Sequence, residues 1–407
     1  MDRNNRNLWI LLCLSSIFLA LAAFITVSKL TSSEGASDAH IYEPAPISQT
    51  ATSTSPSPES GALSDASTTT PPDIVVSSQQ DAHNTPPTVS PSPSVSTPPL
   101  VATTQIMAWI YPGSPACDAA AEIADGRKID VAKAEYFRID ESGLLTLITE
   151  ELDGCNGYSP RNVAHLKKYS TAQYVTVSAN YAHAMGVFLA TDIETSVTTL
   201  TNFVTENNLT GVELDFEDFG GWTPEHYADY KKFIRALGEQ LHAQNKKLMV
   251  DGPAVSNAIE EAWYPWRYAD FKSLPVDYVV IMAYDYQFDH GAGNPVSPLA
   301  WIEDVITFVR NAYPAHEKIV VGLPSYGYRG IEDTQKMKLL TYAQIQKEPG
   351  FETAVRDAAS GEMTWKNGDV RYYYQDSVSL GLKRNVVEKM GITSISVWHL
   401  GGNMWFK

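Results

Sequence analysis

The chain has 407 residues, with 30 lysine and arginine residues against 47 aspartate and glutamate residues, and its net charge is −17. This acidic balance argues against nucleic acid as a partner, because phosphate binding needs a basic surface, and against attachment to an anionic membrane by charge. The length exceeds what one ordinary domain needs, and a hydrophobic content of 44% is ample for a large core.

The first feature along the chain is an apolar run over residues 8–28, which contains no charged residue and follows Arg3 and Arg6. About 20 apolar residues suit a membrane-spanning helix, whereas the core of a signal peptide is usually shorter. A cleaved signal is the alternative, since residues 20–22 read Ala-Leu-Ala. Because the apolar run continues beyond them, we predict an anchor over residues 1–30. The basic N-terminus predicts a single-pass protein of the cell membrane with its domain outside the cytoplasm, or a secreted protein if the segment is cleaved.

Residues 31–103 are dominated by Ser, Thr, Pro and Ala. Such a composition cannot bury enough apolar surface to order itself, so we expect a disordered linker. A flexible chain of this length has its ends on the order of 50 Å apart.

Residues 104–407 have the composition of a globular domain, in which apolar runs alternate with helix-like segments. Strands are expected at 106–111, 132–139, 172–179, 211–218, 247–254, 278–285, 318–324 and 394–399. Helices are expected between them, for example at 193–207, 225–244, 298–313 and 377–390. This alternation predicts an α/β fold, a (β/α)₈ TIM barrel, with a small insertion over about 331–374 between the seventh strand and its helix.

The fourth of these strands carries the most informative pattern. Its apolar residues alternate with Glu213, Asp215 and Glu217, so one face holds three acids. Crowded carboxylates repel, and they shift one another's pKa values in a way that can separate an acid from a base. The pattern therefore indicates chemistry at the end of this strand, and an acidic strand edge or a cation site is the alternative.

Other strand ends carry groups suited to sugars. Tyr284 and Asp285 close the sixth strand, Tyr326 follows the seventh, and Trp398 lies at the end of the eighth. Aromatic rings offer flat apolar faces to pyranose rings, while their polar tips form hydrogen bonds.

Together these motifs resemble those of glycoside hydrolase family 18, the chitinase-like barrel enzymes. The family's fourth-strand motif, D-x-x-D-x-D-x-E, corresponds to residues 210–217. Asp215 and Glu217 match it, whereas Thr210 and Glu213 stand in place of aspartates.

The family's M-x-Y-D, G-L-P-x-Y-G and eighth-strand Trp correspond to residues 282–285, residues 322–327 and Trp398. Two further stretches resemble the spore-cortex and cell-wall branch: residues 374–383, with Asp376, Ser379 and Lys383 among them, and residues 398–405.

The resemblance implies retaining hydrolysis of β-1,4 bonds in a polysaccharide that contains N-acetylglucosamine, with help from the substrate's own acetamido group. Glu217 is then the general acid and base, Asp215 orients the acetamido group, and Tyr284 hydrogen-bonds its carbonyl. Trp398 forms the floor under the sugar, and Tyr326 is a further sugar contact.

Two acids have secondary expected roles: Glu213 tunes Asp215, and Asp285 contacts the leaving sugar. One departure concerns the third strand, where the family's S-x-G-G is reduced to Ser178-Ala179-Asn180, so Asn180 is a candidate cleft residue.

Two functions from different classes remain open at this point. One is an exported hydrolase acting on peptidoglycan or, second, chitin. The other is a lectin-like surface protein on the same barrel, for which the retained Glu217 is a counter-argument.

The three cysteines and nine histidines support neither a disulfide scaffold nor a metal site, so no metal and no cofactor are expected. Cys117 and Cys155 either form a bridge or remain two separate thiols. We expect a monomer whose partners are the polysaccharide and, through the anchor, the membrane.

Overall fold

The computed structural model describes residues 103–110, 119, 121–123, 126–149, 157–191, 193–332 and 334–407. They belong to one compact unit, which runs from Pro98 to Lys407. The predicted anchor, the linker up to residue 102, Cys117 and Cys155 lie outside the described residues. None of the described helices is both long and apolar enough to cross a membrane.

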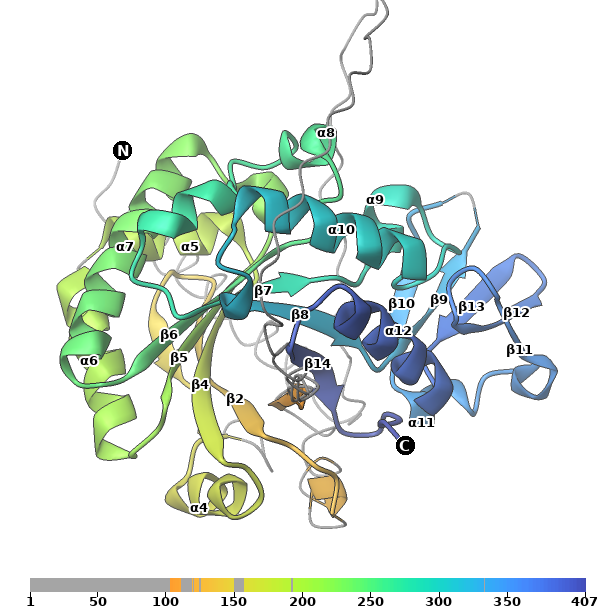
Figure 1. Ribbon diagram of the computed structural model, residues 1–407, viewed down its shortest axis with the longest axis horizontal. Helices are drawn as coiled ribbons and strands as arrows, with labels where there is room; N and C mark the ends of the chain where they lie inside the picture. Colours follow the sequence, from red (N-terminus) through yellow and green to blue (C-terminus); the bar gives the residue numbers. More distant parts are fainter. Residues whose placement is uncertain are drawn as a thin grey trace, which may run out of the picture. The chain divides into compact units, whose positions relative to one another are not determined.

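Eight parallel strands form a closed barrel, in the order β1-β14-β8-β7-β6-β5-β4-β2, with β2 pairing back onto β1 (Figure 1). The strands are β1 (Gln105–Ile110), β2 (Val131–Ile139), β4 (Ala172–Ala179), β5 (Gly211–Phe216), β6 (Lys247–Pro253), β7 (Tyr278–Met282), β8 (Ile319–Pro324) and β14 (Ser394–Leu400). A short strand, β3 (Leu145–Leu147), extends β2 as an antiparallel neighbour. The predicted barrel is confirmed, and each predicted strand overlaps an observed one.

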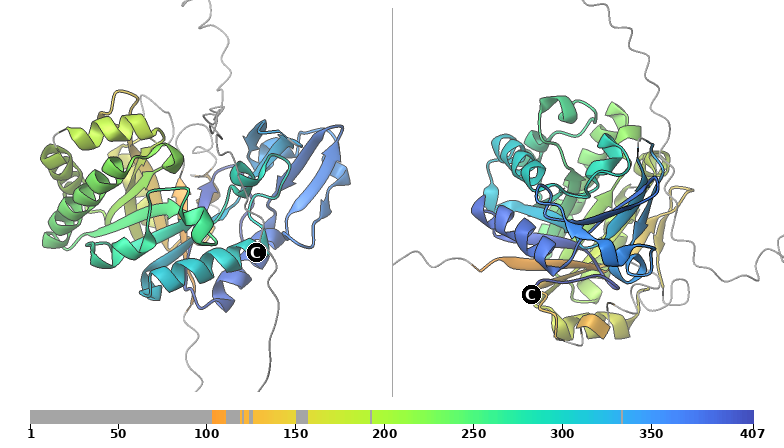
Figure 2. Two further views of the ribbon diagram at one scale, coloured as in Figure 1. Left: turned by 90° about the horizontal axis from the view of Figure 1, so that it is seen from above. Right: turned by 90° about the vertical axis from the view of Figure 1, so that its right-hand side faces the viewer.

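Helices cover the outside of the barrel (Figures 1 and 2). The described helices are α4 (Pro160–Tyr169), α5 (Ala182–Ala190), α6 (Ile193–Glu206), α7 (Pro224–Ala243), α8 (Ala258–Glu261), α9 (Tyr286–His290), α10 (Leu299–Ala312), α11 (Tyr342–Ile345) and α12 (Ser377–Lys389). The longest, α7, begins where the Thr223 hydroxyl accepts the His226 N–H and Pro224 takes the first position. Both features favour a helix start.

The two faces of β5 are used as the sequence predicts. Phe216 packs against Phe188 of α5 and against Tyr230 and Phe233 of α7, so the apolar face is turned to the helices. The alternate residues, Glu213 and Asp215, therefore face the barrel interior.

The barrel interior is layered. The N-terminal ends of the strands contribute an apolar cluster of Met107, Val131, Tyr174, Met249, Val280 and Val320. Two residues further along the strands, the interior becomes polar, with Lys133, Thr176, Glu213 and Asp251, all buried. Since inward side chains recur every second residue, the next layer meets the C-terminal mouth, which is where barrels of this kind carry their sites.

Two strands end earlier than the sequence predicts. The expected strand 211–218 ends at Phe216, and the expected strand 278–285 ends at Met282. In each case an aspartate adopts a left-handed backbone conformation and turns the chain, with φ of 54° at Asp218 and 63° at Asp285.

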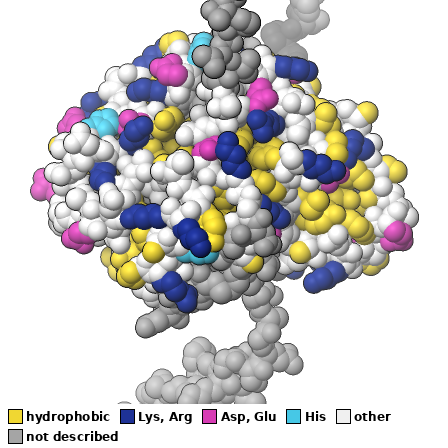
Figure 3. Space-filling model, turned by 60° about the horizontal axis from the view of Figure 1, so that its bottom comes forward, with side chains coloured by type: hydrophobic (Ala, Val, Ile, Leu, Met, Phe, Trp, Pro, Cys, Tyr) yellow, Lys and Arg dark blue, Asp and Glu magenta, His cyan; other side chains and the backbone are white. Residues whose placement is uncertain are grey.

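The predicted insertion is a five-stranded antiparallel sheet between β8 and α12, to one side of the barrel (Figure 2). Its strands are β9 (Gly327–Ile331), β10 (Met337–Leu340), β11 (Val355–Arg356), β12 (Met363–Asn367) and β13 (Val370–Tyr374). It starts at Gly327 rather than at residue 331. Gly327 pairs with Tyr374 so closely that a Cβ there would lie 2.5 Å from the Tyr374 Cβ. Hydrophobic side chains gather on the insertion side of the surface in Figure 3.

Candidate active site

Glu217 is the first residue after β5, and its backbone is held from two sides. Its N–H donates to the carbonyl of Ala179 at 2.8 Å, and its carbonyl accepts the indole N–H of Trp222 at 2.8 Å. The next residue, Asp218, accepts the N–H of Ala182 at 3.0 Å and fixes the turn. These contacts hold the Glu217 side chain at the C-terminal mouth of the barrel.

The environment of Glu217 favours its protonated form. Burial, followed by the negative charges of Asp285, Glu135 and Asp218, raises its pKa to about 7. A carboxylic acid with this pKa keeps its proton near neutral pH, as a general acid requires.

Asp215 lies one layer deeper, with 4% of its surface exposed. Burial and then the charge of Glu217, with smaller contributions from Asp251 and Glu213, raise its pKa well above the usual range. Its Oδ1 has no hydrogen-bond donor among the described residues. Because crowding and burial both disfavour charge, Asp215 and Glu217 cannot both ionise easily.

Glu213 contacts Lys133, not solvent. The Lys133 ammonium donates to Glu213 Oε1, and the Thr176 hydroxyl donates to Oε2 at 2.6 Å. Glu213 and Lys133 are both fully buried, and Lys133 also lies 5.2 Å from the ring centre of Trp109. Glu213 is thus placed to act on Asp215 through its charge. Its own carboxylate is surrounded by buried protein side chains and does not reach the surface of the site.

Three charged residues of the barrel interior are not among the site residues that the sequence predicts. Lys133 and Glu135 alternate with apolar residues on β2, which is the same charge alternation that revealed β5. Asp251 is the only charged residue between Met249 and Pro253 on β6. Neither of its carboxyl oxygens has a donor among the described residues, and burial together with Glu213 raises its pKa well above normal, against the opposing charge of Lys133.

Tyr284 and Asp285 follow β7 and enter the same site. The charges of Asp215, Asp251 and Glu217 all add to the burial that raises the pKa of Tyr284, so its hydroxyl stays protonated. Gly322 of β8 provides the room for its ring, because a Cβ there would lie 2.9 Å from Tyr284 Cε1. The G-L-P motif therefore begins with glycine for a packing reason.

Asp285 is held by two phenols. Tyr326 donates to its Oδ1, and Tyr328 also hydrogen-bonds it. Burial raises the pKa of Asp285 to about 7, although both tyrosine hydrogen bonds oppose the shift. Tyr326 is fully buried, so in this structure its hydroxyl supports Asp285.

Trp398 closes one side of the site with other aromatic rings. Its ring lies 6.4 Å from that of Tyr284 at an interplanar angle of 27°, and 4.9 Å from that of Tyr326, edge to face. Trp109 approaches it edge-on at 6.4 Å. Trp398 remains partly exposed, which leaves ring surface for a ligand.

The structure thus brings Asp215, Glu217, Tyr284, Asp285 and Trp398 to one end of the barrel. Asn180 follows the last residue of β4 at the same end and is exposed. In the part of the chain described, no group of three His, Cys, Asp or Glu side chains is arranged to hold a metal ion. A protonated acid beside a second carboxyl, a phenol and an aromatic wall suits acid-catalysed cleavage next to a sugar.

Comparison with known proteins agrees with this geometry. The model of the glycosyl hydrolases family 18 matches residues 170–403, more than half of the chain. The chain is 24% identical over 268 residues to a cortical fragment-lytic enzyme of Bacillus subtilis, covering 59% of this chain and 59% of that protein. It therefore spans less than two thirds of that relative's length.

Two solved structures share the fold. A chitinase from Chromobacterium violaceum has a TM-score of 0.62 at 21% identity, over 74% of this chain and 95% of that one. The spore cortex-lytic enzyme SleL of Bacillus cereus has a TM-score of 0.58 at 18% identity, over 75% and 72%. The family model matches more than half of the chain, and the fold and the site agree with it. The chain therefore belongs to glycosyl hydrolase family 18.

Proposed function

We propose that the protein hydrolyses β-1,4 bonds of a polysaccharide containing N-acetylglucosamine. Peptidoglycan is the first candidate and chitin the second, because the cortical fragment-lytic enzyme and SleL are named for lysis of spore cortex. The observation that carries the proposal is the position of Glu217 at the mouth of the barrel beside Asp215 and Tyr284, in surroundings that favour its protonated form.

The proposed reaction has two steps and retains the anomeric configuration. In the first, Glu217 gives its proton to the glycosidic oxygen as the bond to the anomeric carbon breaks, and the acetamido carbonyl oxygen attacks that carbon. In the second, the Glu217 carboxylate takes a proton from water, and the water oxygen opens the cyclic oxazolinium ion. General acid–base catalysis of this kind contributes about 10²–10⁴-fold in rate.

Asp215 and Tyr284 act on the acetamido group in this proposal. Asp215 accepts its N–H and stabilises the oxazolinium charge, and Tyr284 donates its hydroxyl to the carbonyl oxygen. The protonated state of Tyr284, favoured by burial among acids, supports this donor role.

The other proposed contacts with the sugar come from residues around the mouth of the barrel. Trp398 has exposed ring surface at the site and is proposed as the floor under the sugar. Asp285 is partly exposed and is proposed to contact the leaving sugar, with Tyr326 behind it. Asn180, exposed at the end of β4, is proposed to line the cleft.

We further propose that the enzyme works outside the cytoplasm as an anchored monomer. The apolar run over residues 8–28 and the Ser/Thr/Pro-rich segment after it support an anchor and a spacer. A spacer of that length would let the barrel reach polymer on the order of 50 Å from the membrane.

The test compares the full chain, purified in mild detergent, with its Glu217→Gln variant. Both are incubated with peptidoglycan sacculi and with chitin oligosaccharides, and the released reducing ends are identified by mass. Wild type should release fragments with N-acetylglucosamine ends, and Glu217→Gln should lose at least about 10²-fold of the rate. The polymer that yields fragments is the substrate.

A measurement of sugar binding distinguishes the hydrolase from the alternative, a lectin-like surface protein. Glu217→Gln should still bind the oligosaccharide, because the variant keeps the shape of the site. If both proteins bind but neither releases product, the chain is a lectin-like surface protein and the hydrolase proposal fails.

A further inference from the structure

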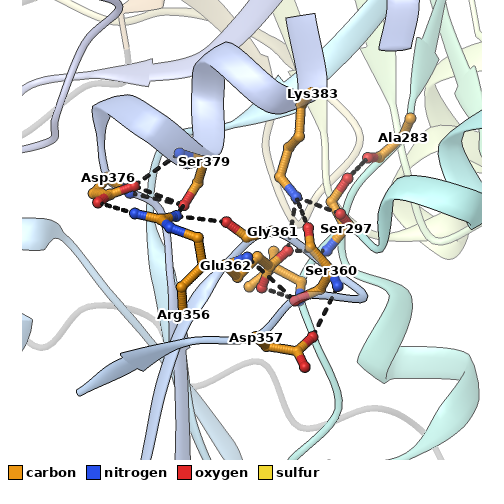
Figure 4. Close-up of polar contacts among 11 residues, drawn as sticks. Ala283, Ser297, Arg356, Asp357, Ser360, Gly361, Glu362, Asp376, Ser379 and Lys383 are labelled. Carbon is orange, nitrogen blue, oxygen red and sulfur yellow. Dashed lines mark hydrogen bonds and ion pairs between the residues drawn. The ribbon is translucent and has the colours of Figure 1, made fainter. Parts of the chain in front are cut away.

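The sequence around residues 374–383 has no part in the reaction described above, yet its Lys383 is fully buried. Lys383 extends from α12 toward the loop between β11 and β12 of the insertion (Figure 4). Its ammonium donates to Glu362 Oε1 at 3.0 Å, to the carbonyl of Ser360 at 3.3 Å and to the carbonyl of Ser297. All three donors of the ammonium are therefore used.

Glu362 is the second member of this buried pair and holds the segment before α10. Its carboxylate accepts the backbone N–H of Val296 at 2.9 Å and that of Ser297 at 2.7 Å. Since Glu362 belongs to the insertion, this segment is fixed jointly by the insertion and by α12.

The same segment reaches the catalytic loop. The Ser297 hydroxyl donates to the carbonyl of Ala283 at 2.6 Å (Figure 4), and the N–H of Tyr286 donates to the carbonyl of Val296 at 3.0 Å. Ala283 and Tyr286 flank Tyr284 and Asp285. Both ends of that dipeptide are thus tied to residues that Glu362 holds.

The dipeptide needs such support. Asp285 has a φ of 63°, a conformation that a residue other than glycine keeps only when its surroundings impose it. A displacement of about 1 Å at a reacting group can cost on the order of 10²-fold in rate, so the placement of the Tyr284 hydroxyl matters.

We propose that Ser297, fixed by the buried Glu362–Lys383 pair, is a positioning residue for Tyr284, through which the insertion sets the geometry of the active site. The kinetic part of this inference rests on the proposed function. The structural part, that Ser297 holds residues 283–286, does not.

The chain offers a matched control. Arg356 of β11 makes the neighbouring ionic contact between the insertion and α12, donating to Asp376 Oδ2 at 2.6 Å and to the Ser379 hydroxyl at 3.0 Å. It also donates to the Gly361 carbonyl at 2.7 Å, and none of these contacts among the described residues reaches Ser297 or Ala283. Arg356→Met thus removes one ionic contact between the insertion and α12, while the hydrogen bonds of Ser297 to Ala283 and Glu362 keep both their partners.

The experiment uses the full chain and compares wild type, Ser297→Ala and Arg356→Met. It measures kcat and KM on whichever polymer, peptidoglycan or chitin, the wild type cleaves in the test of the proposed function. Ser297→Ala should lower kcat by about tenfold with KM within about twofold, and Arg356→Met should leave kcat within about twofold. In a Tyr284→Phe background, Ser297→Ala should lower kcat by less than about a further twofold. The reason is that Ser297 acts by placing the Tyr284 hydroxyl, which Tyr284→Phe has already removed. A tenfold effect in both backgrounds, or an equal loss in Arg356→Met, overturns the proposal.

Hydrogen exchange of the peptide that contains residues 283–287 gives a second readout that needs no activity. Exchange should be faster in Ser297→Ala than in wild type and unchanged in Arg356→Met; no acceleration in Ser297→Ala contradicts the inference. If Ser297→Ala does not fold, Ser297→Cys, which keeps the size of the side chain and weakens its hydrogen bond, takes its place in both measurements. Loss of the proposed function itself appears separately, as wild type that is no more active than Glu217→Gln.

Discussion

At the scale of single residues, the raised pKa of Glu217 has a consequence for stability. Its pKa is about 7 in the folded protein against an ordinary value of 4.5, so the folded chain binds the proton more tightly than the unfolded chain. Its contribution to stability is therefore complete below about pH 4.5 and is lost as the pH rises through about 7.

Replacing Glu217 by Gln removes this pH-dependent contribution. We compare the free energy of unfolding of the variant with that of wild type at two pH values. The difference, variant minus wild type, should be larger at pH 8 than at pH 4 by up to about 3 kcal/mol. The check is the free energy of unfolding from urea titrations of both proteins at the two pH values. A difference between the proteins that does not change with pH would contradict the raised pKa.

The same pKa predicts the alkaline limit of activity. The first step of the proposed reaction needs Glu217 protonated, so kcat/KM should fall about tenfold per pH unit above about pH 7. The measurement is a pH–rate profile at low substrate concentration. A flat profile up to pH 9 would assign the acid role to another group.

At the scale of secondary-structure elements, Lys133 of β2 and Glu213 of β5 form a buried ion pair across the barrel interior. Removing one partner of such a pair leaves an uncompensated charge, which typically costs about 3–5 kcal/mol. Lys133→Met should therefore destabilise the protein by that amount in denaturant titrations.

The double variant Lys133→Met with Glu213→Gln is the control for this prediction. It leaves no buried charge at the pair, so it should recover part of the lost stability. An equal loss in the single and double variants would show that packing of the Lys133 chain matters and its charge does not.

The elements also show what the sequence could and could not reveal. Alternation on β5 predicted both its faces, because a side-chain period of two is a local property. The ends of β5 and β7 were misplaced, since Asp218 and Asp285 turn the backbone for reasons that lie in contacts with other segments. The sequence does not single out Asp251, because one acid in an otherwise apolar strand forms no alternation with other charged residues. Its meaning appears only when the closed barrel places it beside Glu213.

At the scale of the whole molecule, the apolar run over residues 8–28 predicts that the enzyme is anchored in the membrane by its N-terminal segment. The full chain should sediment with membranes and resist extraction with high salt, whereas a chain lacking residues 1–30 should not. Fractionation followed by immunoblotting checks this. A full chain found in the medium at a reduced mass would indicate a cleaved signal instead.

The closure of the barrel sets a condition on biosynthesis. Gln105 of β1 pairs with Ser394 of β14, so strands 289 residues apart (394 − 105) must meet before the ring is complete. A chain that stops before residue 394 leaves one edge of β1 and one edge of β8 without their shared neighbour. Open edges of this kind are templates for pairing between chains. A prematurely terminated product would therefore aggregate and be degraded, even though every acid of the active site had already been synthesised.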